Sequence, residues 1–272
     1  MVVFPGCKIN IGLNILNKRL DGYHHLQTIF YPIDIKDALE IIVVPNQPTA
    51  VVFRSSGIEI IGNSNQNLCV KAYHLLKKDF PELAPVEMHL HKTIPMGAGL
   101  GGGSADAAFA LLLLNQLFEL QLSTDSLMKY ALQLGSDCPF FIYNKPCLAT
   151  GRGEIIEPIQ LDLSAYKILV VNPGIHINTT MAFKHITPGI HTTDLRKIIE
   201  HPISQWKNLL INDFEKTIFE QEPAIQYLKE SLYQAGALYA SMSGSGSSVF
   251  GIFDTQFNQQ LNLPQECYYK WV

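Results

Sequence analysis

The stretch "IPMGAGLGGGSADAA", residues 94–108, has glycine at five of the seven positions from Gly97 to Gly103. It follows the alternating apolar segment "PVEMHLHKTIP" (85–95), which predicts a half-buried strand, and it leads into a helix predicted from about residue 104 to 120. A strand, a glycine-rich turn and a helix N-terminus together suit a phosphate, because unpaired N–H groups and the helix dipole converge on an anion there. The stretch therefore predicts a phosphate site, with a plain strand-to-helix turn as the alternative.

Two other glycine motifs fit the stretch less well. A Walker loop needs a lysine where Gly103 stands, so that motif is excluded. Gly97, Gly99 and Gly102 match the G-x-G-x-x-G spacing of a dinucleotide site. That site also needs an acidic residue about twenty positions later at the end of a strand, whereas Glu119 falls inside the predicted helix. Spacing alone therefore keeps the dinucleotide motif open but does not favour it.

The composition is that of an ordinary globular protein. The 272 residues are 47% hydrophobic and 16% charged, with a formal net charge of −4 that favours neither a nucleic-acid partner nor an anionic membrane. Five scattered cysteines without a C-x-x-C pair indicate reduced thiols rather than disulfides or a zinc site. The N-terminus lacks the pattern of a signal peptide, and the longest apolar run, "AAFALLLL" (107–114), is too short to span a membrane. We expect a cytoplasmic protein.

The remaining sequence mixes strand and helix signals. Strands are expected at 2–16, 38–44, 85–95, 147–150 and 166–171, a hairpin at 51–62, and final strands within 238–253. Helices are expected at 67–80, 104–120, 124–134, 179–186, 192–200, 203–219 and 222–235, with the loop "LGSDCPFF" at 134–141. This pattern predicts an α+β fold of two domains, each a mixed or antiparallel sheet covered by helices. We place the boundary between these domains at residues 155 and 156.

Four further segments, taken with the glycine stretch, resemble one family. "PMGAGLGGGSADAA" resembles the phosphate loop of the galactokinase–homoserine kinase–mevalonate kinase–phosphomevalonate kinase superfamily. "KINIGLNILNKRLDGYHHLQTIF" (8–30), "LGSDCPFF" (134–141), "NPGIHINTTMAFK" (172–184) and "SMSGSGSSVFGIF" (241–253) resemble its other motifs, in the same order. The run "GLGGGS", rather than "GLSSS", is similar to the branch that phosphorylates a cytidylated alcohol. The resemblance covers nearly the whole chain. It implies an N-terminal ATP-binding and catalytic domain at 1–155, a C-terminal substrate-binding domain at 156–272 and an active site in the cleft between them.

The resemblance implies a catalytic pair. Transfer of a γ-phosphoryl group to an alcohol needs a base near the hydroxyl and a cation that stabilises charge. Asp137 is implied to take the hydroxyl proton, and Lys8 is implied to be its charge partner. From the residues alone, Asp137 would be a turn aspartate and Lys8 a surface lysine.

The resemblance also implies the binding residues. Tyr23 is expected to stack on a cytosine ring, Phe183 to cover the other face of the ring and His24 to bind its polar edge. Asn10, two residues after Lys8 and thus on the same strand face, is expected to bind the methylerythritol hydroxyls. The implied ATP-binding residues are Pro95, Met96, Gly97, Ala98, Gly99, Leu100, Gly101, Gly102, Gly103, Ser104, Ala105, Gly244, Gly246 and Asn67. Asn67, as a possible helix cap, and Lys92, as a possible surface charge, are weaker candidates for an adenine pocket.

Two residues depart from the family pattern. Ala105 replaces a frequent serine, which removes one hydroxyl contact to phosphate. Asp106 would repel phosphate unless it points away or faces Mg²⁺. Mg²⁺ is expected from the reaction, its protein ligands are unknown, and the Ser104 hydroxyl is a candidate.

The implied function is phosphorylation by ATP of the 2-hydroxyl of a cytidine-diphosphate-linked methylerythritol, in non-mevalonate isoprenoid precursor synthesis. The expected partners are these small molecules, and the chain is a monomer or a homodimer. The alternatives are another kinase of the same superfamily, of the homoserine or mevalonate type, and a nucleotide-binding protein without catalysis.

Overall fold

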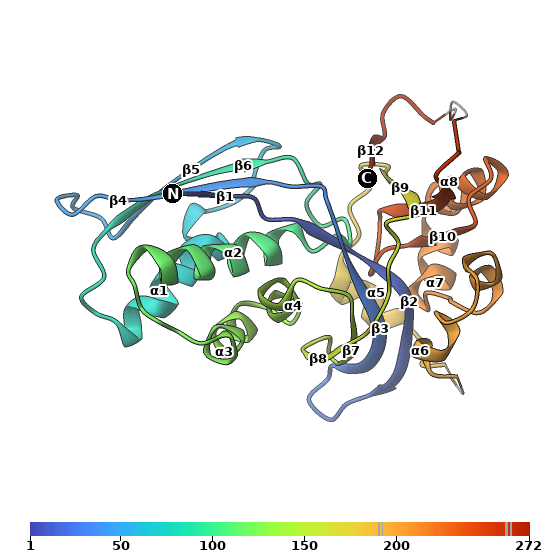
Figure 1. The fold of residues 1–272 in the computed structure, drawn as a ribbon, viewed down its shortest axis with the longest axis horizontal. Coiled ribbons are helices and arrows are strands. Elements are labelled where there is room, and N and C mark those ends of the chain that lie inside the picture. Colours follow the sequence, from blue (N-terminus) through green and yellow to red (C-terminus); the bar gives the residue numbers. More distant parts are fainter. Residues whose placement is uncertain (190, 192, 259–260, 262) are drawn as a thin grey trace. The chain divides into compact units, whose positions relative to one another are not determined.

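The computed structural model describes residues 1–189, 191, 193–258, 261 and 263–272, and the chain forms two compact units (Figure 1). The first unit consists of Met1–Cys7, Asp34–Met96 and Gly101–Asn144. The second unit consists of Lys8–Ile33, Gly97–Leu100 and Lys145–Val272. Both units therefore draw on separate stretches of sequence. The functional division at residues 155 and 156 stays a prediction.

The first unit contains a four-stranded mixed sheet. Its strand order is β1-β4-β6-β5, with β6 antiparallel to β4 and parallel to β5. Its strands are β1 (Val2–Val3), β4 (Ala38–Val43), β5 (Val51–Gly57) and β6 (Val86–Lys92). Along β6 the buried residues Val86, Met88 and Leu90 alternate with polar ones, as the sequence predicts.

Helices lie on one side of this sheet, the first two against the sheet and the next two against those helices. They are α1 (Leu68–Asp79), α2 (Gly102–Leu117), α3 (Thr124–Leu134) and α4 (Cys138–Tyr143), with a 3₁₀ turn η1 (Ser64–Gln66) before α1. Figure 1 shows α1 and α2 below the sheet. Apolar side chains of the sheet, such as Ile41 and Met88, join those of α1 and α2, such as Leu76 and Leu111, in one buried core. This packing fixes the start of α2, which contains the last two glycines of the stretch, Gly102 and Gly103.

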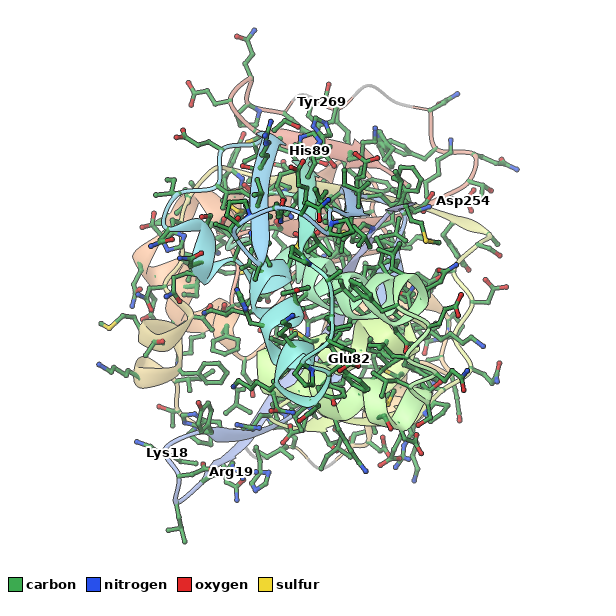
Figure 2. The ribbon with its side chains drawn as sticks, turned by 90° about the vertical axis from the view of Figure 1, so that its left-hand side faces the viewer. Lys18, Arg19, Glu82, His89, Asp254 and Tyr269 are labelled. Atoms are coloured by element: carbon green, nitrogen blue, oxygen red, sulfur yellow. The ribbon has the colours of Figure 1, made fainter. Side chains whose placement is uncertain are left out.

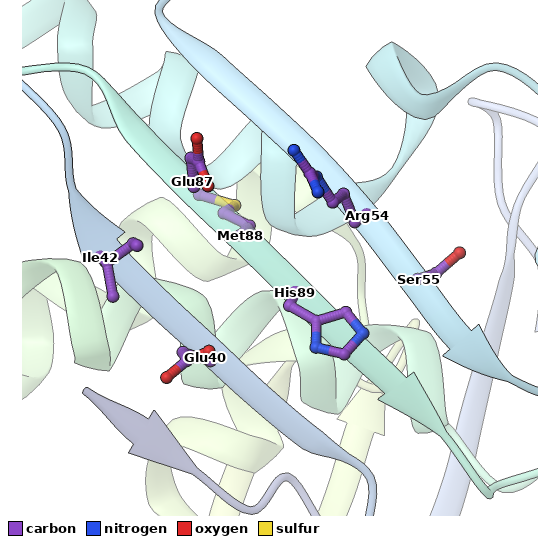
Figure 3. A pocket seen from close by; sticks show the side chains of 7 residues that line it. All are labelled: Glu40, Ile42, Arg54, Ser55, Glu87, Met88 and His89. Atoms are coloured by element: carbon purple, nitrogen blue, oxygen red, sulfur yellow. The ribbon is translucent and has the colours of Figure 1, made fainter. Parts of the chain in front are cut away.

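Among the described residues of the first unit, no helix lies on the other face of the sheet (Figure 1). This face holds a shallow hollow of about 430 Å³ (Figure 3). The lining residues are Glu40, Ile42, Arg54, Ser55, Glu87, Met88 and His89. None of them is a predicted site residue.

The second unit contains two four-stranded sheets, of orders β2-β3-β7-β8 and β10-β11-β9-β12. The strands of the first are β2 (Cys7–Lys18), β3 (His24–Ile33), β7 (Cys147–Gly151) and β8 (Ile155–Pro158). Those of the second are β9 (Tyr166–Asn172), β10 (Tyr239–Met242), β11 (Val249–Asp254) and β12 (Tyr268–Trp271). The helices are α5 (Thr179–His185), α6 (Leu195–Ile198), η2 (Ile203–Asn208), α7 (Phe214–Gln221) and α8 (Pro223–Gln234). Leu169, Phe214 and Leu228 are among the residues of its core.

Several predicted elements differ from the observed ones. The segment 51–62 is not a hairpin, because only 51–57 is a strand and its partner is β6. The predicted strand 2–16 divides at Pro5 into β1 and β2, which lie in different sheets. The loop 134–141 contains the start of α4, and the helix predicted at 203–219 is two helices separated near Asn212. The helix predicted at 192–200 is observed as α6 alone, and residue 192 lies outside the described residues.

Candidate active site

Lys8 and Asn10 lie near the start of β2, in the second unit, and both are buried, with exposed fractions of 3% and 2%. The Nζ of Lys8 donates to Oδ1 of Asn10 and, across 3.0 Å, to the carbonyl oxygen of Gly99. It also lies 5.0 Å from the centre of the Phe30 ring. The predicted common face of Lys8 and Asn10 is confirmed by this contact, and the expectation of a surface lysine is wrong.

Residues 97–100 contact the second predicted glycine turn, around residue 244. The carbonyl oxygen of Gly99 accepts from Oγ of Ser243 at 2.9 Å, and the N–H of Ser248 donates to the carbonyl of Ala98 at 3.1 Å. Gly99 has φ +77°, and a Cβ there would lie 1.9 Å from the carbonyl oxygen of Ser243. Only glycine permits this approach. The second unit therefore joins two glycine segments that are about 144 positions apart.

Two residues that the sequence reasoning missed hold this second turn. Asn212 donates from Nδ2 to the carbonyls of Met242 (2.7 Å) and Gly244 (2.8 Å). Glu215 accepts the N–H of Met242 at 2.9 Å. The sequence held a signal for this region: Asn212 and Asp213 fall inside the helix predicted at 203–219, although Asn and Asp favour helix starts over helix interiors.

In the first unit, the N-terminus of α2 has no side-chain cap. Its N-cap residue, Gly101, is left-handed (φ 72°), and the described residues provide no side-chain cap hydrogen bond there. An uncapped, dipole-positive helix end is suited to a phosphate. Ala105 is fully buried, so its side chain contributes to the core. The backbone N–H donors that the sequence predicted are therefore present at the start of α2. The replacement of a serine by Ala105 does not remove them.

The carboxylate of Asp106 lies in a buried charge cluster beside the first residue of α2. Its Oδ2 accepts from Nζ of Lys92 at 2.7 Å, and Lys92 also pairs with Asp37. Asp37 in turn accepts the N–H groups of Thr93 (2.6 Å) and Ile94 (2.9 Å). The surface-charge interpretation of Lys92 is therefore wrong. The repulsion of phosphate by Asp106 is reduced by a partner within the first unit.

The cluster perturbs the titration of its members. Burial raises the pKa of Asp106 to about 7, with Lys92 opposing the rise and Asp37 adding to it. Burial also disfavours the charge on Lys92, but Asp106 and Asp37 outweigh it and raise the pKa of that lysine. Two carboxylates thus share one ammonium group in a site with almost no access to water.

Asp137 is half-buried and lies at the N-cap position of α4, followed by a proline in the first turn of the helix. α4 packs beside the start of α2. The Ser104 hydroxyl is hydrogen-bonded to the Cys138 thiol, and burial raises the pKa of that thiol to about 12. The first unit therefore places the loop of Asp137 next to the N-terminus of α2, where the predicted phosphate site lies.

Two of the predicted cytosine-binding residues contact each other in the second unit. The rings of His24 and Phe183 are stacked, with centres 5.3 Å apart and planes 20° apart. Burial, and to a lesser extent Lys18, lowers the pKa of His24, which favours its neutral form. A neutral imidazole both donates and accepts.

Tyr23 precedes His24 and is 56% exposed, at the end of the turn that follows Lys18, the last residue of β2, and begins with Arg19 (Figure 2). The guanidinium of Arg152 lies 5.0 Å from the centre of its ring. The roles of Tyr23, His24 and Phe183 in substrate binding stay predictions.

Asn67 is the N-cap of α1, since its Oδ1 accepts the N–H of Cys69 at 2.9 Å. The cap is confirmed, and its role in ATP binding stays a prediction. Among the described residues, no three His, Cys, Asp or Glu side chains gather as a metal-binding group. Within the same residues, none of the helices has the length and apolar character needed to cross a membrane.

Known proteins match this chain over most of its length. Residues 67–145 match the GHMP kinases N terminal domain, and residues 195–266 match the GHMP kinases C terminal family. A Bacteroides fragilis protein named 4-diphosphocytidyl-2-C-methyl-D-erythritol kinase is 52% identical over 256 residues, which cover 94% of this chain and 93% of the relative. A Cytophaga hutchinsonii protein of the same name is 49% identical and covers 98% of both chains.

Solved structures agree with these matches. The crystal structure of a 4-(cytidine 5'-diphospho)-2C-methyl-D-erythritol kinase has a TM-score of 0.79 and 30% identity, covering 93% of this chain and 90% of the other. The Methanococcus jannaschii mevalonate kinase, with a TM-score of 0.71 and 14% identity, covers 94% of this chain and 92% of its own and shares the fold. The α+β kinase fold predicted from the sequence is confirmed, and the chain belongs to the 4-diphosphocytidyl-2-C-methyl-D-erythritol kinase family of the GHMP kinases.

Proposed function

We propose that this chain transfers the γ-phosphoryl group of ATP to the 2-hydroxyl of 4-(cytidine 5'-diphospho)-2-C-methyl-D-erythritol, a step of non-mevalonate isoprenoid precursor synthesis. The observation that carries the proposal is the 52% identity, over 94% of the chain, to a kinase named for that substrate. The uncapped start of α2, the joined glycine segments and the buried Lys8 supply features that such a kinase needs.

The proposed reaction is a direct displacement. The carboxylate of Asp137 takes the proton of the 2-hydroxyl, and the hydroxyl oxygen forms a bond to the γ-phosphorus. The bond from that phosphorus to the bridging oxygen breaks, and ADP leaves with the electron pair. Lys8 is the proposed charge partner, and its ammonium is held in place by Asn10 and Gly99. No phosphoenzyme is formed.

The proposed cytosine site uses aromatic surfaces of the second unit. Tyr23 offers an exposed ring, and the stacked pair of His24 and Phe183 offers a ring and a neutral imidazole. Stacking holds a flat base, and the imidazole recognises its polar edge. A substrate without a base gains nothing from these groups, which favours the cytidylated alcohol over mevalonate or homoserine.

Mg²⁺ is proposed to enter with ATP. A cation of this kind keeps most of its ligands from phosphates and water and needs few from the protein, so the lack of a three-residue metal group among the described residues does not oppose it. When bound, it neutralises charge on the phosphates. The Ser104 hydroxyl, in the first turn of α2, is the proposed protein ligand.

The test is an assay of ADP release with three alcohols in parallel: the cytidylated methylerythritol, mevalonate and homoserine. We expect turnover with the first and at least about 100-fold lower kcat/KM with the others, a difference typical of a site built to bind a polar group. Preference for mevalonate or homoserine would identify another kinase of the superfamily. ATP binding without turnover of any alcohol would identify a non-catalytic nucleotide-binding protein.

A further inference from the structure

Thr28 is a fully buried residue of β3 with a hydroxyl group between two parts of β2. Its Oγ1 lies 2.5 Å from the carbonyl oxygen of Gly12 and 2.9 Å from Nδ2 of Asn10. Neither the resemblance nor the comparisons assign this residue a role.

The chemistry of a hydroxyl fixes the direction of both bonds. Thr28 has one hydroxyl hydrogen, and the Gly12 carbonyl can only accept, so the hydrogen goes to Gly12. The hydroxyl can then only accept from Asn10, which must present its Nδ2 to Thr28. The amide of Asn10 is thereby oriented with Oδ1 toward the ammonium of Lys8.

The reverse orientation would be unfavourable. A flipped Asn10 amide would present N–H donors to the ammonium of Lys8, which is itself a donor and carries a positive charge. Lys8 would keep the Gly99 carbonyl as an acceptor and lose Asn10. Its Nζ would then lose one of the acceptors that hold its position.

Gly12 supplies the acceptor because of its unusual backbone. It lies inside β2 with φ +68°, a left-handed conformation that glycine adopts without strain. A Cβ there would also lie 3.2 and 3.3 Å from the side chains of Leu210 and Leu195. Gly12 thus holds the Thr28 hydroxyl, and the hydroxyl in turn holds the Asn10 amide.

We propose that Thr28 is a positioning residue, which orients the Asn10 amide and through it the ammonium of Lys8 for phosphoryl transfer. This inference rests on the proposed function, in which Lys8 acts on the transferred group. Thr28 acts through Asn10 and does not touch the substrate.

The first experiment compares Thr28→Val with Thr28→Ser. Valine keeps the volume and removes the hydroxyl, while serine keeps the hydroxyl. We expect Thr28→Val to lower kcat about 10- to 100-fold, an effect of lost orientation, and to leave the KM for ATP within about threefold. Thr28→Ser should retain kcat within about threefold of the wild type. Tyr31→Phe, which removes another β3 hydroxyl, bonded to the N–H of Leu163, is the control and should retain kcat.

Folding is measured by thermal unfolding of each variant. If Thr28→Val does not fold, Thr28→Cys replaces it, because a thiol is a weak donor and a weak acceptor. The kcat of Thr28→Cys should then be lower than that of the wild type and of Thr28→Ser. It should be higher than that of Asn10→Ala. A Thr28→Cys kcat equal to that of the wild type would overturn the inference.

A double-mutant cycle tests whether Thr28 acts through Asn10. In an Asn10→Ala background, Thr28→Val should change kcat by less than about twofold, because the amide that it orients is gone. If the two effects on kcat multiply, the inference is wrong. If the wild-type chain fails to turn over the cytidylated alcohol, the proposed function fails first. Wild-type turnover with an unaffected Thr28→Val overturns only the role of Thr28.

Discussion

The Nζ of Lys92 donates to Oδ2 of Asp106 across 2.7 Å, in a place where both side chains are almost fully buried. Lys92 is the last residue of β6, and Asp106 lies in the first turns of α2. The pair therefore joins the end of a strand to the start of the helix that begins with the last glycines of the stretch. Asp37, which pairs with the same lysine, adds a second carboxylate.

Asp106 should make stability fall as the pH rises. Its folded pKa of about 7 lies above the ordinary 3.8, so the folded state binds the extra proton between these values. The stabilisation is complete below about pH 4 and is lost as the pH rises toward 7. Urea unfolding gives the free energy of unfolding of the wild type and of Asp106→Asn. The wild-type value minus the variant value should be about 1–3 kcal/mol smaller at pH 8 than at pH 5.

The control is Asp125→Asn, an exposed first-turn acid of α3, for which the same difference should stay nearly constant. A difference that rises with pH for Asp106→Asn would contradict the raised pKa.

Gly99→Ala should disrupt the contact between the two glycine segments. A Cβ at Gly99 meets the Ser243 carbonyl at 1.9 Å, so the segments must separate. We expect the KM for ATP to rise at least about tenfold, since the phosphate-binding backbone loses its position. The control is Gly236→Ala, which has φ +102° but open space around its Cβ. It should cost about 1–2 kcal/mol of stability and leave the KM for ATP unchanged. Equal effects of the two variants on KM would show that strain alone matters.

Asp137→Asn and Lys8→Met should fold and bind ATP but lose turnover. Removal of the proton acceptor or of the positive charge should lower kcat by about 10²- to 10⁴-fold. Asp34→Asn, at an exposed surface carboxylate, is the matched control. Steady-state kinetics and direct ATP binding measure the two effects separately. A near-wild-type kcat in either variant would remove that residue from the mechanism.

Tyr23→Ala and Phe183→Ala should weaken binding of the cytidylated substrate. Loss of a stacking surface should raise its KM by about 5- to 100-fold, with the KM for ATP nearly unchanged. Tyr227→Ala removes an exposed tyrosine of α8 and should leave both constants as they are. An effect limited to ATP would assign these rings to the nucleotide.

Variants of Asn67 separate its observed cap from its predicted ATP contact. Asn67→Ser keeps a side-chain cap for α1, whereas Asn67→Ala removes it and should cost about 1 kcal/mol in chemical unfolding. If Asn67 also binds ATP, both variants raise the KM for ATP. If it only caps the helix, Asn67→Ser behaves as the wild type in both measurements.

Local patterns allowed much of the fold to be predicted. The alternation of Val86, Met88 and Leu90 predicted β6, and Asn67 before an apolar helical face predicted the start of α1. The same alternation includes Lys92, two residues after Leu90, and thus contained a signal for a buried lysine that needs an acidic partner. The predicted hairpin at 51–62 was wrong because strand pairing is non-local, and β5 pairs with the distant β6.

The sequence by itself determined the kinds of groups present: glycines before a helix, a lysine and an asparagine two residues apart on a strand, and a carboxylate before α4. These depend on backbone freedom, strand periodicity and helix-start chemistry, all of which act over a few residues. Only the tertiary structure decided which groups meet: Gly99 with Ser243, Lys92 with Asp37 and Asp106, and Thr28 with Asn10. These contacts join residues that are 14 to 144 positions apart in the sequence. No local pattern selects them, because they depend on the packing of the whole core.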